Sequence, residues 1–518
     1  MPSTYTHHFS TPLYKGNVTL NTGYVDQVVF GDHAPIWVVV LSSLFINGQW
    51  VDPVEPSTIE VVNPVTGRVI TTVDAGSSKD VDIAVQAAKE AYKTSWGLHC
   101  TGEARGKLLG KLADIMEKHI SELSALETLN VGKIYKYARN GDLPSAIQTI
   151  RYFAGWADKI HGDTVETNEQ KLAYTRREPF GVVGQIVPWN FPLCMACWKI
   201  APALATGNVV VLKPSEFTPF TALKLAEYVM EAGFPPGVVN IINGYGNTVG
   251  QAISEHPEIR KVAFTGSTLT GRKVLKAAAE SNLKVVTLEL GGKSPVIIFD
   301  DVDIDQVAQQ AAFGIFYNMG QVCTAGSRIF VQEGIYDKFL AKMTEITRAA
   351  GAAAGDPFQP STLHGPQVSK TQFDRVMSYI QSGKQDGAKV HIGGERIGSE
   401  GYFIHPTIFT DTKPDMKIVR EEIFGPVVVI SKFKDEAEVI ELANDTLYGL
   451  ACSVFCENVG RAHRVAHAME AGTVWVNHTL QTEVSFPFGG YKQSGMGREQ
   501  GKYALDTYTQ VKTVLVKL

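Results

Sequence analysis

The sequence predicts an α/β fold with a doubly wound parallel sheet, because short apolar stretches alternate with segments of helical periodicity. The apolar stretches are rich in β-branched residues and predict buried strands at 181–187, 209–212, 238–242, 261–264 and 285–288. Helical periodicity falls between them at 192–204, 222–232 and 270–281. In such sheets ligands bind at the carboxyl ends of the strands, where we expect the functional site.

Further elements are expected before and after this region. Asn47-Gly48 separates two short β-like stretches and predicts a tight hairpin. Helical patterns follow it at 81–91 and 103–119. Residues 295–473 form a second α/β segment, with helical patterns at 340–350 and 439–443. The tail at 511–518 alternates as a strand does, but no partner strand lies beside it in the sequence.

The composition narrows the class of protein. The chain has 518 residues, 44% of them hydrophobic and 19% charged, which suits roughly three globular domains of about 150 residues each. A net charge of −5 without Lys/Arg-rich blocks argues against nucleic acid or an anionic membrane as partner. Six cysteines are too few for a disulfide scaffold and indicate a reducing compartment. Cys194 and Cys197 are interpreted as packed thiols, and since no cluster has metal-ligand spacing, no metal is expected.

The first 43 residues form an atypical N-terminal extension. They contain one lysine, Lys15, and no arginine, which argues against a mitochondrial presequence. The apolar run at 36–46 is shorter than the roughly 20 residues that span a bilayer. We expect a soluble, cytoplasmic protein. Residues 24–43 are interpreted as an insertion that packs poorly.

A thiol and a carboxylate are the candidates for covalent chemistry. Cys323 lies between a glycine-bearing turn at 318–320 and a β-branched run at 328–331, and Glu289 lies 34 residues upstream of it. A thiol can attack a carbonyl carbon, and a carboxylate can activate the water that releases the product. A free thiol with a pKa near 8.5 is mostly protonated at pH 7, so we expect local dipoles or a bound cofactor to lower the pKa of Cys323.

Polar residues follow three of the predicted strands. Lys213 and Glu216 come after the second, and Gly266 and Ser267 come after the fourth, where they could contact ribose and phosphate groups. The ordinary G-x-G-x-x-G fingerprint is absent, and the Gly292-Lys293-Ser294 segment lacks the first glycine of a P-loop.

The first strand is followed by Pro188-Trp189-Asn190-Phe191-Pro192. The neutral amide of Asn190 suits an oxyanion, although Asn190 taken alone is better interpreted as a turn residue.

Together these motifs resemble the aldehyde dehydrogenase superfamily, and most closely its broad-specificity NAD-dependent class. The resemblance covers about residues 44–518, and its motifs occur in the expected order at 188–192, 213–216, 264–267, 289–295, 320–328, 421–426 and 487–495. It implies a Rossmann-type coenzyme domain (44–160 and 180–291), an α/β catalytic domain (292–506) and a β oligomerisation arm (161–179 and 507–518). The tail strand would then add to a neighbouring subunit's sheet, so a homodimer or homotetramer is expected.

The resemblance also assigns catalytic roles. Cys323 is the nucleophile, and the oxyanion is held by the Asn190 amide and the Cys323 backbone N–H. Glu289 is the base that activates water, and Lys199 and Glu499 relay protons to it. NAD is the implied cofactor, contacted by Trp189, Lys213, Glu216, Gly266, Ser267, Glu422 and Phe424. Among these, Glu216 favours NAD over NADP because a carboxylate repels a 2′-phosphate.

The implied substrate pocket is an apolar, aromatic tunnel formed by Phe191, Met195, Trp198, Tyr317 and Phe488. It suits an uncharged aliphatic or aromatic aldehyde. Small-aldehyde members usually have an acid and an aromatic residue where Leu480 and Thr482 stand here, so a wider or differently shaped pocket is expected. The physiological aldehyde and the use of NADP are left open.

Two alternatives to a hydrolytic aldehyde dehydrogenase are a catalytically inactive protein on the same scaffold and a dehydrogenase that passes the acyl group to coenzyme A. The presence of Cys323, Glu289 and Asn190 argues against the first. Glu289 favours water over coenzyme A as the acceptor.

Overall fold

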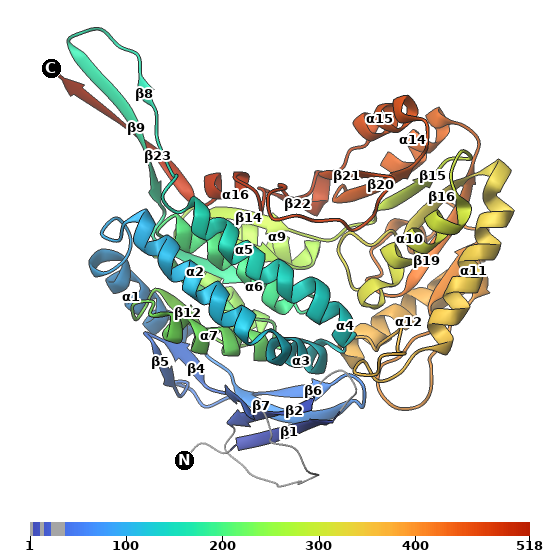
Figure 1. Cartoon of the computed structure of the whole chain (residues 1–518), viewed down its shortest axis with the longest axis horizontal. Coiled ribbons are helices and arrows are strands. Elements are labelled where there is room, and N and C mark those ends of the chain that lie inside the picture. The colour runs from blue at the N-terminus through green and yellow to red at the C-terminus, as the bar shows by residue number, and fades with distance from the viewer. Residues whose placement is uncertain (1–3, 11–14, 22–36) are drawn as a thin grey trace.

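The computed structural model describes residues 4–10, 15–21 and 37–518. Two sheets with their helices form the two large bodies of the chain, and a narrow β arm projects from the first (Figure 1). This arrangement confirms the predicted α/β fold.

The first sheet lies within the range predicted for the coenzyme domain except for a short edge strand at 495–496. Its strand order in the described chain is β22 (Gly495–Met496), β14 (Val285–Glu289), β13 (Lys261–Thr265), β10 (Val182–Ile186), β11 (Val209–Lys213), β12 (Val239–Ile241), β4 (Leu44–Ile46) and β5 (Gln49–Val51). The strands from β14 to β12 are parallel, as expected, whereas β22 and the β4–β5 hairpin add antiparallel edges. The five parallel strands match the predicted ones to within one or two residues at either end.

Helices surround this sheet and bury its faces. They are α1 (Ser78–Thr94), α2 (Gly102–Lys118), α3 (Ile120–Val131), α5 (Leu143–Trp156), α6 (Pro192–Ala205), α7 (Phe220–Ala232), α8 (Gln251–Glu255) and α9 (Thr268–Ser281). The core includes Ala504, Leu505 and Tyr508 from α16 (Tyr503–Asp506) and the residues after it. Residues 495–508 therefore pack with the first sheet, although most of them fall within the range predicted for the catalytic domain.

The second sheet has the order β17 (Lys389–Ile392), β18 (Thr407–Thr410), β19 (Val427–Phe433), β16 (Arg328–Gln332), β15 (Pro295–Ile298), β20 (Ala451–Phe455) and β21 (Thr473–Val476). All its pairings are parallel except that of β17 with β18. Its helices include α10 (Ile304–Phe316), α11 (Tyr336–Ala352), α12 (Lys370–Gln385), α13 (Lys417–Arg420), α14 (Glu436–Asn444) and α15 (Val459–Ala468).

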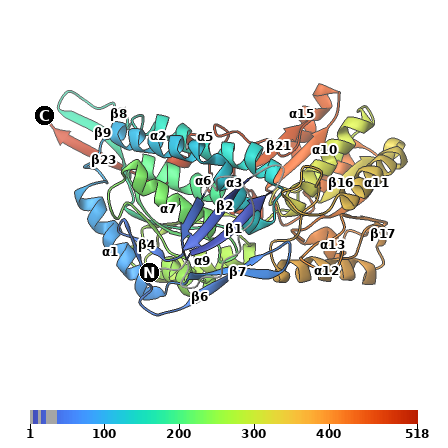
Figure 2. The ribbon, with the colours of Figure 1, turned by 60° about the horizontal axis from the view of Figure 1, so that its bottom comes forward.

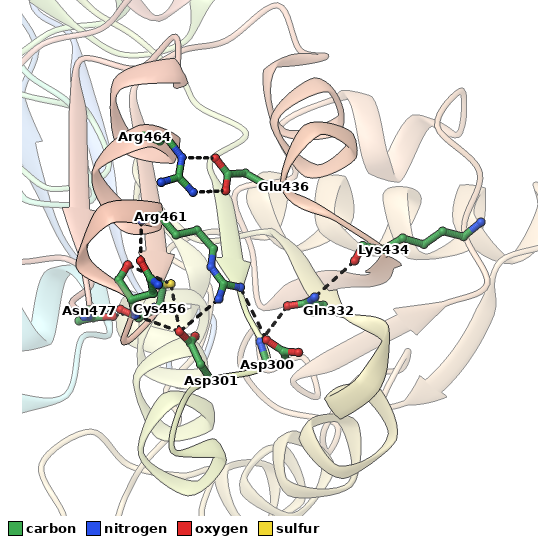
Figure 3. A network of polar contacts seen from close by, with 10 residues as sticks. Asp300, Asp301, Gln332, Lys434, Glu436, Cys456, Arg461, Arg464 and Asn477 are labelled. Carbon is green, nitrogen blue, oxygen red and sulfur yellow. Dashed lines mark hydrogen bonds and ion pairs between the residues drawn. The ribbon is translucent and has the colours of Figure 1, made fainter.

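A polar network fixes α15 beside the end of β15 (Figure 3). The Arg461 guanidinium lies 3.6 Å from carboxylate oxygens of Asp300 and Asp301. Burial and the Asp301 carboxylate raise the pKa of Cys456 to about 11, so this thiol stays protonated. Cys456 is buried and packs in the hydrophobic core on this side of the second sheet.

The arm consists of β8 (Thr164–Val165), β9 (Lys171–Pro179) and β23 (Thr509–Lys517). The partner of the tail strand is β9 of the same chain, which pairs with it antiparallel along its whole length. A sequence separation of more than 300 residues hid this pairing from sequence analysis. In the described chain β23 lies at the edge of this sheet, so its addition to a neighbouring subunit stays a prediction.

The N-terminal extension contributes β1 (Thr4–Ser10), β2 (Lys15–Asn21) and β3 (Trp37–Leu41), which form a separate sheet. In Figure 2 these strands lie in front of the first body, where β3 runs near α7. Residues 24–36 of the proposed insertion lie outside the described residues, so the prediction that it packs poorly is not tested. A further hairpin, β6 (Thr58–Asn63) and β7 (Arg68–Asp74), leads into α1.

Candidate active site

A cavity of about 1250 Å³ lies between the two sheets and is lined by residues from both. The first sheet contributes the segments that follow β10, β13 and β14 at their carboxyl ends, as the parallel topology predicts. The second body contributes the loop that carries Cys323 and the segment around Glu422. The candidate nucleophile thus faces three strand ends of the other sheet.

A left-handed turn presents Cys323 to the cavity. Asn318, Met319 and Gly320 have φ of 48°, 56° and 73°, which reverses the chain after α10. A Cβ at Gly320 would collide with the carbonyl group of Gly425, so glycine is required at this contact. The turn sets the loop against the second sheet and places Cys323 just before β16.

The pKa of the Cys323 thiol is raised to about 12. Burial is the largest cause, followed by the carboxylates of Glu422 and Glu289, while backbone N–H groups at Thr324 and Cys323 partly oppose them. The expectation that the pKa of Cys323 is lowered is therefore wrong for the protein without a bound cofactor. The sequence could not reveal it, because the two carboxylates come from distant segments.

The Asn190 side chain is held next to the nucleophile's loop. Its Nδ2 donates to the backbone carbonyl of Gln321 at 2.9 Å, two residues before Cys323. An amide nitrogen carries two hydrogens, and the second has no hydrogen-bond partner among the described residues. Asn190 is buried and lines the cavity, so it offers one fixed, neutral donor.

Glu289 ends β14 beside Thr265, which ends β13. It is buried, and its Oε2 lacks a hydrogen-bond partner within the described part of the chain. Burial and the nearby Glu499 raise its pKa well above the usual range, whereas Lys199 acts in the opposite direction. Lys199 Nζ lies 2.6 Å from Glu499 Oε1 and donates to Thr265 Oγ1 at 2.6 Å. Lys199 does not line the cavity itself, but contacts Glu499, which does.

The predicted cofactor residues form two groups. Lys213 and Glu216 lie together at the end of β11, with Nζ and Oε2 3.2 Å apart, but neither lines the cavity. Gly266 and Ser267 line it at the N-terminus of α9. The Ser267 hydroxyl accepts the Thr270 N–H at 3.2 Å and so caps the helix.

The second group lies across the cavity. Glu422 Oε1 accepts the Gly292 N–H at 3.0 Å, and burial raises the pKa of Glu422 to about 7. A Cβ at Gly291 would overlap the Glu422 carboxylate, so this approach requires glycine. Phe424, at φ 61°, meets Trp189 edge-to-face with ring centroids 5.1 Å apart.

All predicted substrate residues line the cavity: Phe191, Met195, Trp198, Tyr317, Leu480, Thr482 and Phe488. Trp198 meets Phe488 edge-to-face at 5.3 Å, and Phe191 stacks on Tyr317 at 6.2 Å. Sequence analysis missed Tyr137 and Phe313, whose rings lie 5.3 and 5.0 Å from that of Tyr317. The i, i+4 spacing of Phe313 and Tyr317 was the available signal. Sequence analysis also missed glutamines that line the cavity, among them Gln148, Gln306, Gln309 and Gln310.

Neither metal ligands nor membrane spans are found in the described residues. No group of three or more His, Cys, Asp or Glu side chains there is placed to hold a metal ion. No helix in the same ranges is long and apolar enough to cross a bilayer.

The fold and the cavity define an α/β protein with a buried site between two sheets, and sequence comparisons identify its family. The profile of the aldehyde dehydrogenase family matches residues 50–514. An aldehyde dehydrogenase of Agaricus bisporus is 58% identical over 518 residues, covering 100% of this chain and 99% of that protein. The mitochondrial aldehyde dehydrogenase of Homo sapiens is 51% identical over 482 residues and covers 93% of both. The chain therefore belongs to the aldehyde dehydrogenase family, as its motifs predict.

Solved structures agree with this assignment. The NAD+ complex of aldehyde dehydrogenase from Bacillus cereus superposes with a TM-score of 0.90 at 48% identity, covering 92% of this chain and 96% of that one. An indole-3-acetaldehyde dehydrogenase of P. syringae, in complex with NAD+ and IAA, has a TM-score of 0.90 at 40% identity, with coverages of 92% and 97%. The predicted aldehyde dehydrogenase fold is confirmed.

Proposed function

We propose that this protein oxidises an apolar aldehyde to the carboxylic acid, with NAD as hydride acceptor and water as acyl acceptor. The observation that carries the proposal is the convergence of Cys323, Asn190 and Glu289 on one cavity. Each supplies a different part of covalent aldehyde oxidation: a nucleophile, an oxyanion donor and a base.

In the first half of the reaction the Cys323 sulfur attacks the aldehyde carbon. The carbonyl oxygen takes the developing negative charge, and the free Asn190 amide hydrogen and the Cys323 backbone N–H hold it. The thiol proton leaves through the nearby carboxylates, whose raised pKa values make them effective acceptors. NAD, when bound, would supply the hydride acceptor, and loss of hydride from the thiohemiacetal would leave a thioester on Cys323.

In the second half Glu289 removes a proton from water, and the hydroxide attacks the thioester. A base works best with a pKa near the working pH, and burial with the neighbouring Glu499 moves Glu289 in that direction. Lys199 and Glu499 extend from this base into the first body and carry its proton away. The acid leaves and Cys323 regains its thiol.

The residues present fit a dinucleotide. The N-terminus of α9 with Gly266 suits a pyrophosphate, and Glu422 suits ribose hydroxyls. Glu216 beside the buried Lys213 suits an adenosine ribose and opposes a 2′-phosphate, so NAD is preferred over NADP. The NAD+ complexes of related structures support this choice.

The tunnel favours an uncharged aliphatic or aromatic aldehyde, because its inner walls are aromatic and apolar. The indole-3-acetaldehyde dehydrogenase relative supports an aromatic substrate. Leu480 and Thr482 widen or reshape the lining relative to small-aldehyde enzymes.

For the assembly, we infer a homodimer or homotetramer joined through the arm. The cytoplasmic location expected from the sequence stays a proposal, since relatives named mitochondrial exist.

The test is NADH formation from a panel of aldehydes, with Cys323→Ala, Glu289→Gln and Asn190→Ala beside the wild type. Cys100→Ala is the matched control, because it removes a partly exposed cysteine far from the cavity lining. The proposal is supported if Cys323→Ala is inactive, Asn190→Ala has a slower NADH burst, Glu289→Gln gives a burst that then stalls, and Cys100→Ala keeps the wild-type rate. Unchanged turnover in Cys323→Ala overturns it. A wild-type rate that requires added coenzyme A would instead identify the acylating alternative. If no aldehyde gives NADH, the protein is the catalytically inactive scaffold.

A further inference from the structure

We propose that Lys133 is a positioning residue for Asn190, holding the backbone of the oxyanion donor through a buried charged hydrogen bond. The inference rests on the proposed function, in which Asn190 stabilises the oxyanion. Lys133 lies between α3 and the short helix α4 (Tyr135–Tyr137), and its side chain is 0% exposed. Neither the sequence motifs nor the family resemblance drew attention to it.

The contacts of Lys133 converge on the segment that carries Asn190. Its Nζ donates to the Asn190 carbonyl oxygen at 3.0 Å and lies 3.9 Å from the centre of the Phe191 ring. The Asn318 side-chain amide donates to the same carbonyl at 3.1 Å. Two donors therefore fix the Asn190 peptide, while the Asn190 side chain is fixed separately by Gln321. Because both the peptide and the side chain of Asn190 are held, the free hydrogen of its amide points in one fixed direction.

The charge of Lys133 is costly to bury, and the fold compensates for it locally. Asp142 forms an ion pair with Lys133 Nζ and is itself only 5% exposed. The other titratable groups around this pair are Glu127, whose pKa is raised to about 7 mainly by burial, the thiol of Cys194 and the hydroxyl of Tyr317. Removing one partner of a buried ion pair leaves an uncompensated charge and is destabilising. Replacing both partners by apolar residues of similar volume is often neutral or stabilising. We infer that the pair is retained because a charge-assisted hydrogen bond holds the Asn190 carbonyl more firmly than a neutral one.

The same network reaches the substrate tunnel. The Tyr317 hydroxyl donates to Asp142 Oδ1 at 2.8 Å, and the Tyr317 ring stacks against Phe191. One carboxylate thus connects the wall that meets the aldehyde with the lysine that holds the oxyanion donor. The substrate wall and the donor are therefore positioned by the same buried ion pair.

The experiment is a double-mutant cycle of Lys133→Met and Asn190→Ala, read as the rate of the pre-steady-state NADH burst at saturating aldehyde. We expect Lys133→Met to slow the burst roughly 10- to 100-fold, since misplacing an oxyanion donor has an effect of that size. Its effect on NAD affinity, measured by fluorescence titration, should be small. In the Asn190→Ala background the same substitution should change the burst less than about threefold, because the group it positions is already gone.

Lys284→Met is the matched control, since Lys284 is also buried and donates to a backbone carbonyl, that of Ser254, at 2.6 Å. Equal slowing by Lys133→Met in both backgrounds, or a lowered melting temperature with an unchanged burst, overturns the inference and leaves Lys133 a structural residue. An unchanged burst in Asn190→Ala alone instead overturns the proposed function. If Lys133→Met does not fold, Asn318→Gly removes the second donor while suiting the left-handed backbone at φ 48°, and the same non-additivity with Asn190→Ala is expected.

Discussion

The reactivity of Cys323 in the cofactor-free protein offers a quantitative test of the site's electrostatics. A pKa of about 12, against the ordinary value near 8.5, corresponds to roughly 5 kcal/mol against the thiolate, at about 1.4 kcal/mol per pKa unit. At pH 8.5 the fraction of Cys323 present as thiolate is then on the order of a thousandfold lower than that of an ordinary free cysteine. Alkylation by iodoacetamide should therefore be slow, and its rate should rise tenfold per pH unit up to pH 10 without a plateau.

Glu422→Gln should accelerate this alkylation. Glu422 is the larger of the two carboxylate contributions to the raised thiol pKa, and with its own pKa near 7 it is ionised at pH 8.5. Removing a negative charge lowers the thiol pKa, so we expect about a tenfold faster reaction, equivalent to one pKa unit. Glu289→Gln should give a smaller acceleration, since Glu289 is the lesser cause.

Glu421→Gln supplies the control. Its carboxylate accepts the Tyr379 hydroxyl at 2.7 Å and is not among the groups that shift the Cys323 pKa. The rate constant is measured by mass spectrometry as alkylation of Cys323 against iodoacetamide concentration at each pH. A wild-type plateau near pH 8, or equal acceleration by Glu421→Gln and Glu422→Gln, would refute the electrostatic account of the thiol.

Four further outcomes are expected. Lys199→Met removes the charge that lowers the Glu289 pKa, so the rising limb of the kcat–pH profile should move to higher pH; a shift to lower pH would contradict the relay. Glu216→Gln should tighten NADP binding about tenfold, or 1.4 kcal/mol, in fluorescence titrations, and no gain would argue against its ribose role. Arg328→Met leaves three carbonyls without their donor and should lower the free energy of unfolding by about 3 kcal/mol in urea melts. Val511 lies on β23 and is 62% exposed; if the arm joins subunits, Val511→Lys should shift the oligomer to smaller species in size-exclusion chromatography.

The sequence was sufficient for those features that local patterns determine. The parallel strands β10, β11 and β13 were predictable because buried strands are short, apolar runs, and the residues after each strand then had to meet at one sheet edge. Their meeting placed Asn190 and Gly266 in one cavity.

Features that depend on distant contacts were not predictable. The pairing of β23 with β9 joins segments more than 300 residues apart, and the two-residue strand β22 is too short to give a periodic signal. Lys133 belongs to the same class, because nothing in its own neighbourhood in the sequence indicates that its ammonium group reaches the Asn190 carbonyl. Electrostatic properties such as the Cys323 pKa arise from burial and from carboxylates of separate segments, which a linear sequence does not display.

The position of the site between two separately built sheets has a mechanical consequence. The nucleophile belongs to the second body and the oxyanion donor to the first, so any shift between the bodies would change their separation. In the described chain, three hydrogen bonds cross this boundary close to Cys323: the Asn190 amide bonds to Gln321, the Asn318 amide bonds to the Asn190 carbonyl, and the Tyr317 hydroxyl bonds to Asp142. All of them lie within six residues of Cys323 in the second body. These bonds therefore hold the loop of the nucleophile against the oxyanion donor at the place where a shift between the bodies would otherwise separate them.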